Sequence, residues 1–533
     1  MSVPQGLDTI GTPTMTGSSR SVSEKQHLRD EGGTKTADEL VHLEGPLPKN
    51  GSLTEEEEQF LASVSQEKAN HIYHKVDKRL LPILALLYLV AQIDRANIGN
   101  AKIEGMTKDL HMSGVDYNVA LAIFFIPYIL LEVPSNLVLV KFKRPSHYVG
   151  LLVIGWGIII TCTGVVQNKT ALYITRFFLG VFEAGFFPGA MHIISQWYPP
   201  AKIQLRMSTM YTASALSGAF SGLLAYAIAK MDGVGGYEGW RWIFILEGIG
   251  SVVAGVACCF LLPDTPSLST GWLEPEEARY LQLNHAKTRG RGATTKSKKD
   301  QLRTLIQILT DWQLYLLALV FMSSAAPTYG LKFNMPQIIK EMGFSTSNAQ
   351  LLTVPPYVVG AISALINAFF ADRFTWRMPA MVVATSLVLL SFSVLFVKAG
   401  NISDNVALCY VFVHIALAGV YPIPPGASAW TANNLGPAKR AAGLAFMTSV
   451  GNVGGIIGSF IYMESEAPKY PTGYGTSLAM AAAGMCASLT LDCFYLKINK
   501  ARDGQSEEVI RDKYTDEELE AMDDRSPLFR YNL

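Results

Sequence analysis

The chain has 533 residues with 44 basic and 44 acidic side chains, and 49% of its residues are apolar against 17% that are charged. Soluble chains carry about 25% charged residues, so this composition argues against a purely soluble protein. The balanced net charge gives no indication of nucleic-acid binding. All six cysteines fall in apolar runs, where a thiol behaves as a small hydrophobic group, and they indicate no disulfide framework.

Roughly twelve apolar runs, each about 20 residues long, fill the chain between Leu80 and about Lys497. Because lipid offers the backbone no hydrogen-bond partners, each run must be a helix that satisfies its own amides and carbonyls. The sequence therefore predicts an all-α membrane protein with twelve transmembrane helices in two six-helix lobes. The expected spans are about 80–100, 118–140, 147–167, 171–196, 207–230, 241–262, 312–336, 347–371, 376–398, 405–430, 439–463 and 473–497.

The composition between the apolar runs predicts how the chain is divided. Residues 1–77 are polar and too poor in apolar surface to fold alone, so we expect a disordered cytoplasmic tail. The alternative for part of it is a short amphipathic stretch around Phe60 to Val76 that lies along the membrane surface. We expect an N-terminal six-helix lobe at 78–262, a basic cytoplasmic central loop at 263–311 and a C-terminal six-helix lobe at 312–498. Residues 499–533 are of mixed charge and are expected to form a second cytoplasmic tail.

Positive residues gather in the loops after the second, fourth, sixth, eighth and tenth spans. Because basic loops stay on the cytoplasmic side of a membrane, we expect these loops and both termini to be cytoplasmic. Asn168 and Asn401 then fall in outward loops and match the glycosylation pattern, although these loops are short for modification.

Two charged residues, Asp94 and Arg95, interrupt the first span. A charge inside a membrane is costly, so its presence suggests a function. Adjacent residues on a helix do not face each other, and these two side chains therefore need separate partners. One could face a cavity while the other supports the lobe.

The fourth span carries Arg176 and Glu183 on one face, because residues at spacings of three and four stack along a helix. The two side chains are two turns apart, about 10 Å along the axis, which makes a direct ion pair difficult. A buried carboxyl group can gain and lose a proton at physiological pH. We therefore predict proton coupling at Asp94 and Glu183. The alternative is a salt-bridge set that only holds the first and fourth helices together.

The tenth span ends in a proline-rich segment, Tyr421–Asn434. Prolines free backbone carbonyls, which membrane proteins tolerate where a cavity or gate forms. Trp430 and Asn433 could stack on and hydrogen-bond a planar polar ligand, or the segment could be a kink with an interfacial tryptophan. Lys332, alone in its span, is a weaker candidate.

Motifs of several other chemistries are missing from the sequence. It contains no GxxxxGK[ST] phosphate loop, no GxSxG nucleophile turn and no cysteine or histidine cluster with metal spacing. We therefore expect no cofactor, no metal and no enzymatic activity. Energy for transport would come from an ion gradient or from the gradient of the substrate itself.

Three segments resemble a known family. They are Asp94-Arg-Ala-Asn-Ile-Gly-Asn-Ala101, the stretch from Arg176 through Glu183-Ala-Gly-Phe-Phe-Pro-Gly189, and Trp240-Arg-Trp-Ile-Phe-Ile-Leu-Glu-Gly248. Together they are similar to the anion:cation symporter family of the major facilitator superfamily, in particular to its fungal branch of allantoate and nicotinate permeases. The resemblance covers about residues 75 to 500. It implies the major facilitator fold, alternating access and proton-coupled uptake of organic anions.

The resemblance also implies roles for single residues. The acids that bind protons in the family match Asp94 and Glu183. The arginine linked to anion recognition matches Arg95, and the arginine linked to coupling matches Arg176. The predicted substrate-binding residues are Arg95, Arg176, Trp430 and Asn433.

One loop departs from the family pattern. The superfamily usually has an aspartate near the basic residues after the second helix, whereas this chain has Val140 and Lys141 there. The equivalent loop after the eighth helix keeps Asp372, Arg373 and Arg377. We therefore predict a cytoplasmic gate in the second lobe.

The main hypothesis is a proton-coupled symporter of a small organic anion, a carboxylated vitamin or ureide such as nicotinate or allantoate. Its expected partners are that anion, protons and the lipid bilayer, without nucleic acid, and we expect a monomer. The plasma membrane is expected from the family resemblance. Two alternatives stay open: an exporter of a carboxylated secondary metabolite, and a non-transporting nutrient sensor with a signalling tail.

Overall fold

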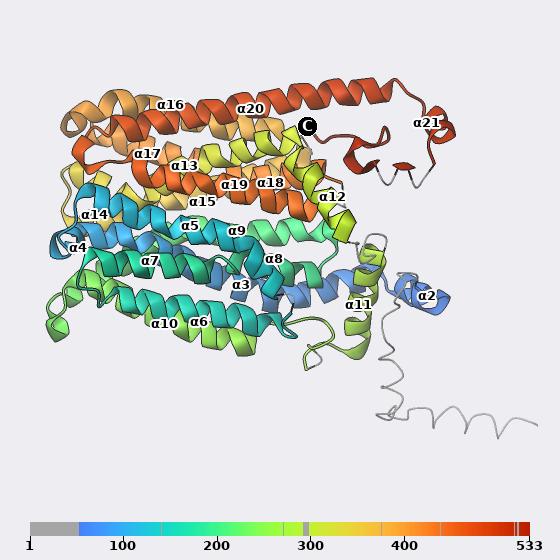
Figure 1. Ribbon diagram of the computed structural model, residues 1–533, viewed down its shortest axis with the longest axis horizontal. Helices are drawn as coiled ribbons and strands as arrows, with labels where there is room; N and C mark the ends of the chain where they lie inside the picture. Colours follow the sequence, from blue (N-terminus) through green and yellow to red (C-terminus); the bar gives the residue numbers. More distant parts are fainter. Residues whose placement is uncertain are drawn as a thin grey trace, which may run out of the picture. The chain divides into compact units, whose positions relative to one another are not determined.

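The computed structural model describes residues 53–139, 141–269, 271–290, 298–374, 376–436, 439–515, 518–519 and 522–533. Long helices run side by side in this part of the chain, and shorter helices cover their ends (Figure 1). One end, which we call the linker end, carries α2 (Glu55–Ser63), α11 (Pro275–Gly290), α12 (Lys298–Leu309) and α21 (Glu507–Lys513). The other, the far end, carries α4 (Met106–Asp109) and α14 (Thr346–Leu352).

Among the described residues, eleven spans are long and apolar enough to cross a membrane. They comprise α5 (Gly114–Leu139), α6 (Pro145–Thr163), α7 (Lys169–Glu183) with α8 (Phe186–Trp197), α9 (Pro200–Ile228), α10 (Gly239–Leu261), α13 (Trp312–Glu341), α14 with α15 (Val354–Phe374), α16 (Met378–Lys398), α17 (Val406–Val420) with α18 (Ile423–Asn434), α19 (Arg440–Ile461) and α20 (Pro471–Asp503). The twelfth long helix is α3 (Gln66–Ile103), which packs against α9, α10 and α13. The expected all-α membrane fold is confirmed.

Short 3-10 turns complete the secondary structure. They are η1 (Ala229–Met231), η2 (Val234–Gly236), η3 (Ala399–Asp404), η4 (Glu464–Glu466) and η5 (Asp523–Arg525).

The long helices form two lobes, each with its own hydrophobic core. In the N-terminal lobe α10 packs on α6, α5 on α7, and α3 on α9, whereas in the C-terminal lobe α13 packs on α19 and α20, and α16 on α17. The lobes meet where α15 packs on α9, α19 on α5, and α13 on α3. The contact between α3 and α13 is close: a Cβ at Gly99 would lie 2.5 Å from the carbonyl oxygen of Phe333. Only glycine fits there without moving one of the helices.

The N-terminal boundary differs from the expectation. Residues 55–77, expected in a disordered tail, form α2 and the first turns of α3. Ser65 caps α3, and the side chains of Tyr73 and Val76 are buried at the linker end. Burial of this apolar face stabilises the helix beyond the membrane-spanning part. Residues 1–52 lie outside the described residues.

The central loop also contains helices, and α11 docks on α3. Lys75 Nζ lies 2.7 Å from Glu277 Oε2, and the Asn284 amide donates to the Tyr73 hydroxyl at 2.7 Å. Burial raises the pKa of Glu277, but its bonds to Lys75 and to the backbone amide of Glu274 outweigh this effect and bring the pKa below its usual value. Within the linker, α11 is therefore firmly attached to the N-terminal lobe.

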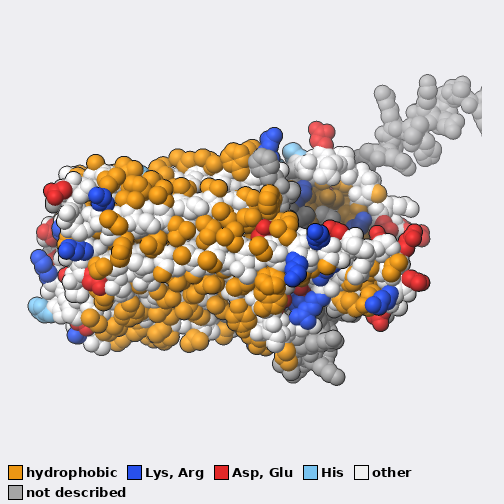
Figure 2. Space-filling model, turned by 90° about the horizontal axis from the view of Figure 1, so that it is seen from above, with side chains coloured by type: hydrophobic (Ala, Val, Ile, Leu, Met, Phe, Trp, Pro, Cys, Tyr) orange, Lys and Arg blue, Asp and Glu red, His pale blue; other side chains and the backbone are white. Residues whose placement is uncertain are grey.

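Apolar side chains cover the lateral surface of the helices that Figure 2 displays, while most charged side chains gather toward the two ends. Large side chains such as Phe260, Val397 and Leu130 are more than two-thirds exposed. Exposing such an apolar surface to water costs free energy, whereas contact with the hydrocarbon core of a bilayer does not. The outside of the bundle is therefore built to face lipid.

Candidate functional site

Arg95 of α3 and Glu183 of α7 form an ion pair in the interior of the N-terminal lobe. Arg95 Nε donates to Glu183 Oε1 at 3.1 Å, and a second guanidinium nitrogen donates to the same oxygen. Their side chains are 2% and 3% exposed. A pair this deeply buried is costly to break, because either partner alone would be an uncompensated charge.

Aromatic rings enclose the guanidinium of Arg95. Its Cζ lies 4.7 Å from the ring centres of Phe124 and Tyr128 on α5, and 5.7 Å from that of Tyr329. Its Nη1 also donates to the Tyr329 hydroxyl at 2.7 Å. Since Tyr329 belongs to α13 of the C-terminal lobe, the charge of Arg95 contacts both lobes.

Asp94 points away from this cluster, toward α6 and α10. Its Oδ2 accepts from Trp156 Nε1 at 3.1 Å and from the Ser251 hydroxyl at 2.6 Å. Glu247 lies one turn before Ser251 on α10, and both of its carboxyl oxygens are buried without a hydrogen-bond partner in the described structure. The two neighbours Asp94 and Arg95 thus have separate partners, as the helix geometry requires.

Arg176 is 1% exposed and lies beside the ion pair. Its Nε donates to the carbonyl of Ala120 at 3.3 Å, and its Cζ is 5.5 Å from the Phe124 ring. Neither of its terminal nitrogens has a partner among the described residues, and neither does Oε2 of Glu183. The cluster therefore holds two guanidinium groups for one carboxylate.

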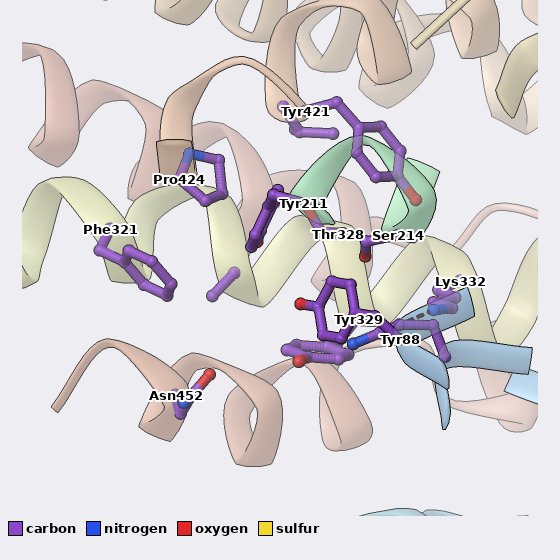
Figure 3. Close-up of a pocket in the computed structure, with 13 residues that line it drawn as sticks. Tyr88, Tyr211, Ser214, Phe321, Thr328, Tyr329, Lys332, Tyr421, Pro424 and Asn452 are labelled. Carbon is purple, nitrogen blue, oxygen red and sulfur yellow. Dashed lines mark hydrogen bonds between the residues drawn. The ribbon is translucent and has the colours of Figure 1, made fainter. Parts of the chain in front are cut away.

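A small cavity of about 40 Å³ lies between the lobes (Figure 3). Its walls come from α3 and α9 on one side and from α13, α17, α18 and α19 on the other. Aromatic and hydroxyl groups face it together with one basic side chain and two amides. The main lining residues are Tyr88, Tyr211, Ser214, Phe321, Thr328, Tyr329, Lys332, Tyr421, Pro424 and Asn452.

Lys332 is the cation of this cavity, and its side chain is buried. Its Nζ donates to Gln92 Oε1 at 2.8 Å and to the Ser217 hydroxyl at 3.3 Å. No carboxylate of a described residue lies within salt-bridge distance of it. Sequence reasoning ranked Lys332 low because it stood alone in an apolar span. That isolation was itself a signal, because a buried cation without an acid needs another counter-charge.

The predicted residues Trp430 and Asn433 do not line this cavity. Trp430 is fully buried near the linker end of α18, and its Nε1 donates to the carbonyl of Asn532 at 2.9 Å. Asn434, next to the half-buried Asn433, binds the same carbonyl at 2.9 Å. The proline-rich segment reaches the cavity through Tyr421 and Pro424 instead.

The predicted gate residues lie at the junction of α15 and α16. Arg373 is exposed near the end of α15, and the backbone amide of Arg377 donates to the Leu533 carbonyl at 2.5 Å. The side chain of Asp372 lies outside the described residues, as does Val140 of the first-lobe loop.

The two candidate glycosylation residues are both exposed and lie in the connections that precede α7 and α17. Asn168 is the N-cap of α7 and accepts from the backbone amide of Ala171 at 2.9 Å. Asn401 lies within η3. Glycosylation of the two residues stays a prediction.

The sequence matches known transporters over most of its length. Residues 84–459 match the family model described as Major Facilitator Superfamily. The chain is 34% identical over 515 residues to the MFS-type transporter cnsO of Penicillium expansum, covering 95% of each protein. It is 32% identical over 399 residues to a putative tartrate transporter of Agrobacterium vitis, covering 74% of this chain and 85% of that protein.

The fold is similar to that of a bacterial homologue of the human lysosomal transporter Spinster in an inward-facing and occupied conformation. The TM-score is 0.58 at 16% identity, over 78% of this chain and 97% of that one. An identity this low shows the fold alone. The family match, the relatives and the apolar helices together indicate a multi-pass membrane transporter rather than an enzyme, and the chain belongs to the Major Facilitator Superfamily.

Proposed function

We propose that this protein is a proton-coupled symporter that takes up a small organic anion by alternating access, as in the anion:cation symporter branch. The observation that carries the proposal is Lys332, a buried cation without a carboxylate partner, facing a cavity between two lobes. A substrate carboxylate would supply the missing negative charge. Secondary transporters bind their substrates at such an interface between repeats.

The cavity walls favour a planar anion. Tyr88, Tyr211, Tyr329 and Tyr421 offer ring faces for stacking and hydroxyl groups for hydrogen bonds. A carboxylate would replace Gln92 and Ser217 as the partner of Lys332, with a stronger charge-assisted bond. Nicotinate joins a carboxylate to a planar aromatic ring, allantoate joins one to two planar ureido groups, and a relative is named as a putative tartrate transporter. We therefore place the substrate among small carboxylates.

Glu183 is the proposed coupling residue, together with Asp94. While Glu183 is charged, it holds Arg95, which in turn holds Tyr329 of the opposite lobe. A proton on Glu183 would weaken its bonds to Arg95 and change the contact between the lobes. Binding of a proton would thus shift the balance between two arrangements of the lobes, which is what coupling requires. Arg176, with its free guanidinium nitrogens, would stabilise the charged state of Glu183 or attract the anion.

The proposed orientation puts the linker end in the cytoplasm. Basic residues of the connections, including Arg206, Arg373 and Lys439, lie at this end, and positive charge stays on the cytoplasmic side. We propose the gate at Asp372, Arg373 and Arg377 on that side, and a monomer in the plasma membrane.

Uptake into proteoliposomes tests the proposal. The purified full-length protein should accumulate nicotinate, allantoate or another carboxylate from a small panel when the outside is made acidic. Glu183→Gln should abolish accumulation while exchange of labelled for unlabelled substrate continues. Lys398→Gln, which neutralises an exposed lysine at the far end, serves as the control and should behave as wild type.

Reversing the gradient separates import from export. An exporter of a carboxylated metabolite that exchanges it for protons would concentrate substrate on the acidic side, whereas a symporter concentrates it on the opposite side. Undiminished accumulation by Glu183→Gln, or no transport of any carboxylate in the panel, would overturn the proposed function.

A further inference from the structure

The last residues of the chain lie in a groove at the linker end of the C-terminal lobe. The ring of Tyr531 stacks on Tyr495 of α20 with 4.6 Å between ring centres and 10° between planes. Its hydroxyl accepts from Gln313 of α13 at 3.3 Å, and Tyr531 is 5% exposed. A tail that was only solvated would not bury an aromatic residue in this way.

Two asparagines bind the backbone of this segment as a pair of clamps. Asn499 donates to the carbonyl of Tyr531 at 2.8 Å and accepts from its amide at 2.9 Å. Asn434 donates to the carbonyl of Asn532 at 2.9 Å and accepts from its amide at 2.6 Å. Trp430 adds a third donor to the Asn532 carbonyl. Both hydrogen-bonding groups of two successive residues are thus satisfied by side chains of the groove, as in peptide-binding sites.

Charged side chains anchor the beginning of the segment. Asp524 is fully buried and forms an ion pair with Lys439, which is 3% exposed. Arg502 donates to the carbonyl of Phe529 at 2.8 Å and lies 4.9 Å from the Tyr531 ring centre. Such buried, charge-assisted contacts fix one position of the peptide in the groove.

The groove shares two helices with the cavity between the lobes. Its walls include α13 and α18, and the same two helices line the cavity through Phe321, Lys332 and Pro424. The segment therefore bridges the linker ends of α13 and α18, which both line the cavity. Each of these helices has proline residues closer to the cavity than to its linker end. Fixing these ends restricts how the helices can bend relative to each other.

We propose that residues 522–533 are the ligand of a peptide-binding groove formed by α13, α18 and α20 of the same chain. Their docking holds the linker ends of α13 and α18 together while the lobes move. Trp430 and Asn434 belong to this groove, and their role is to bind the chain's own C-terminal segment. The proposal stands on contacts outside the cavity and does not depend on which anion is carried.

Hydrogen–deuterium exchange on the full-length protein tests the docking. Asn434→Ala removes two bonds, so the amides of residues 525–533 and of the last turn of α18 should exchange about tenfold faster than in wild type. Trp430→Phe keeps an aromatic ring but loses the indole N–H donor to Asn532, so it should give a smaller change in the same amides. Lys497→Gln, which neutralises an exposed lysine of α20, is the control and should change little.

The exchange rates distinguish docking within one chain from no docking and from docking of a second copy. Faster exchange confined to the segment and its groove in the two groove variants supports the proposal. Wild-type exchange in Asn434→Ala, or rapid exchange of the segment already in wild type, overturns it. Protection that rises with protein concentration would show that a second copy supplies the peptide, and it would overturn docking within one chain.

Discussion

The charged cluster of the N-terminal lobe and the cavity between the lobes differ in how their charges are satisfied. In the cluster, Arg95 and Glu183 neutralise each other behind a wall of aromatic rings. In the cavity, Lys332 has only neutral partners. We call Arg95 with Glu183 the closed pair and Lys332 the open cation. A closed pair suits a proton switch, whereas an open cation suits the recognition of an anion. Tyr329 touches both, because it binds Arg95 and lines the cavity. Under the proposed function, this difference assigns coupling to the cluster and recognition to the cavity, with Tyr329 shared by both.

Breaking the closed pair should have the largest effect. Arg95→Met leaves the carboxylate of Glu183 buried without a partner, which costs about 3–5 kcal/mol. We expect the unfolding midpoint in detergent to fall by about 10 °C, measured by thermal unfolding of the purified protein. The double variant Arg95→Met with Glu183→Leu should recover much of this loss. If the single variant is as stable as wild type, the pair does not hold the lobe together.

Removing the open cation should reduce substrate binding instead of stability. Lys332→Gln keeps a polar group of similar length but loses the charge-assisted bond, worth about 1.5–3 kcal/mol. The Kd for the transported anion should rise about 10- to 100-fold, measured by equilibrium binding in detergent. The unfolding midpoint should stay near wild type, because no charged partner is left behind. Unchanged affinity would place the anion elsewhere.

The shared residue should show an intermediate effect. Tyr329→Phe keeps the ring and removes the hydroxyl that accepts from Arg95 at 2.7 Å. Losing one such bond costs about 1 kcal/mol, so the initial uptake rate should fall about fivefold while binding changes less. Tyr128→Phe is a useful comparison, because its ring also lies against Arg95 at 4.7 Å. Equal effects of the two variants would argue against a special role of Tyr329.

The smallest effect concerns the linker. The pKa of Glu277 is lower in the folded protein, so its pair with Lys75 adds stability above the ordinary glutamate pKa of about 4.3. That contribution should be lost as the pH falls through the folded value. Exchange of α11 amides should therefore accelerate below about pH 4.5, and less so in Lys75→Ala, which lacks the pair already. A wild-type linker with the same acid sensitivity as the variant would contradict this role.

Much of the fold could be predicted because a bilayer leaves few choices. The twelve apolar runs had to be helices, and the structure contains them. The start of α3 was weighed only as the second alternative, because the burial of Tyr73 depends on contacts with distant residues, Tyr198, Lys202 and Tyr280. The polar composition of residues 1–77 favoured a disordered tail.

The candidate site was less predictable, because it depends on contacts between distant segments. Helix spacing correctly separated Asp94 from Arg95, but no spacing pairs Arg95 with a residue 88 positions later. Trp430 and Asn433 looked able to bind a ligand, whereas in the structure Trp430 and the neighbouring Asn434 bind a backbone segment about a hundred residues later. An isolated Lys332 could have been ranked higher on its charge alone.

The most direct test of the division between recognition and coupling compares Glu183→Gln with Lys332→Gln on the same preparation and substrate. We predict that Glu183→Gln binds the anion with near wild-type affinity and cannot concentrate it against a gradient. Lys332→Gln should lose binding. Wild-type accumulation by the first variant, or wild-type affinity in the second, would contradict the account.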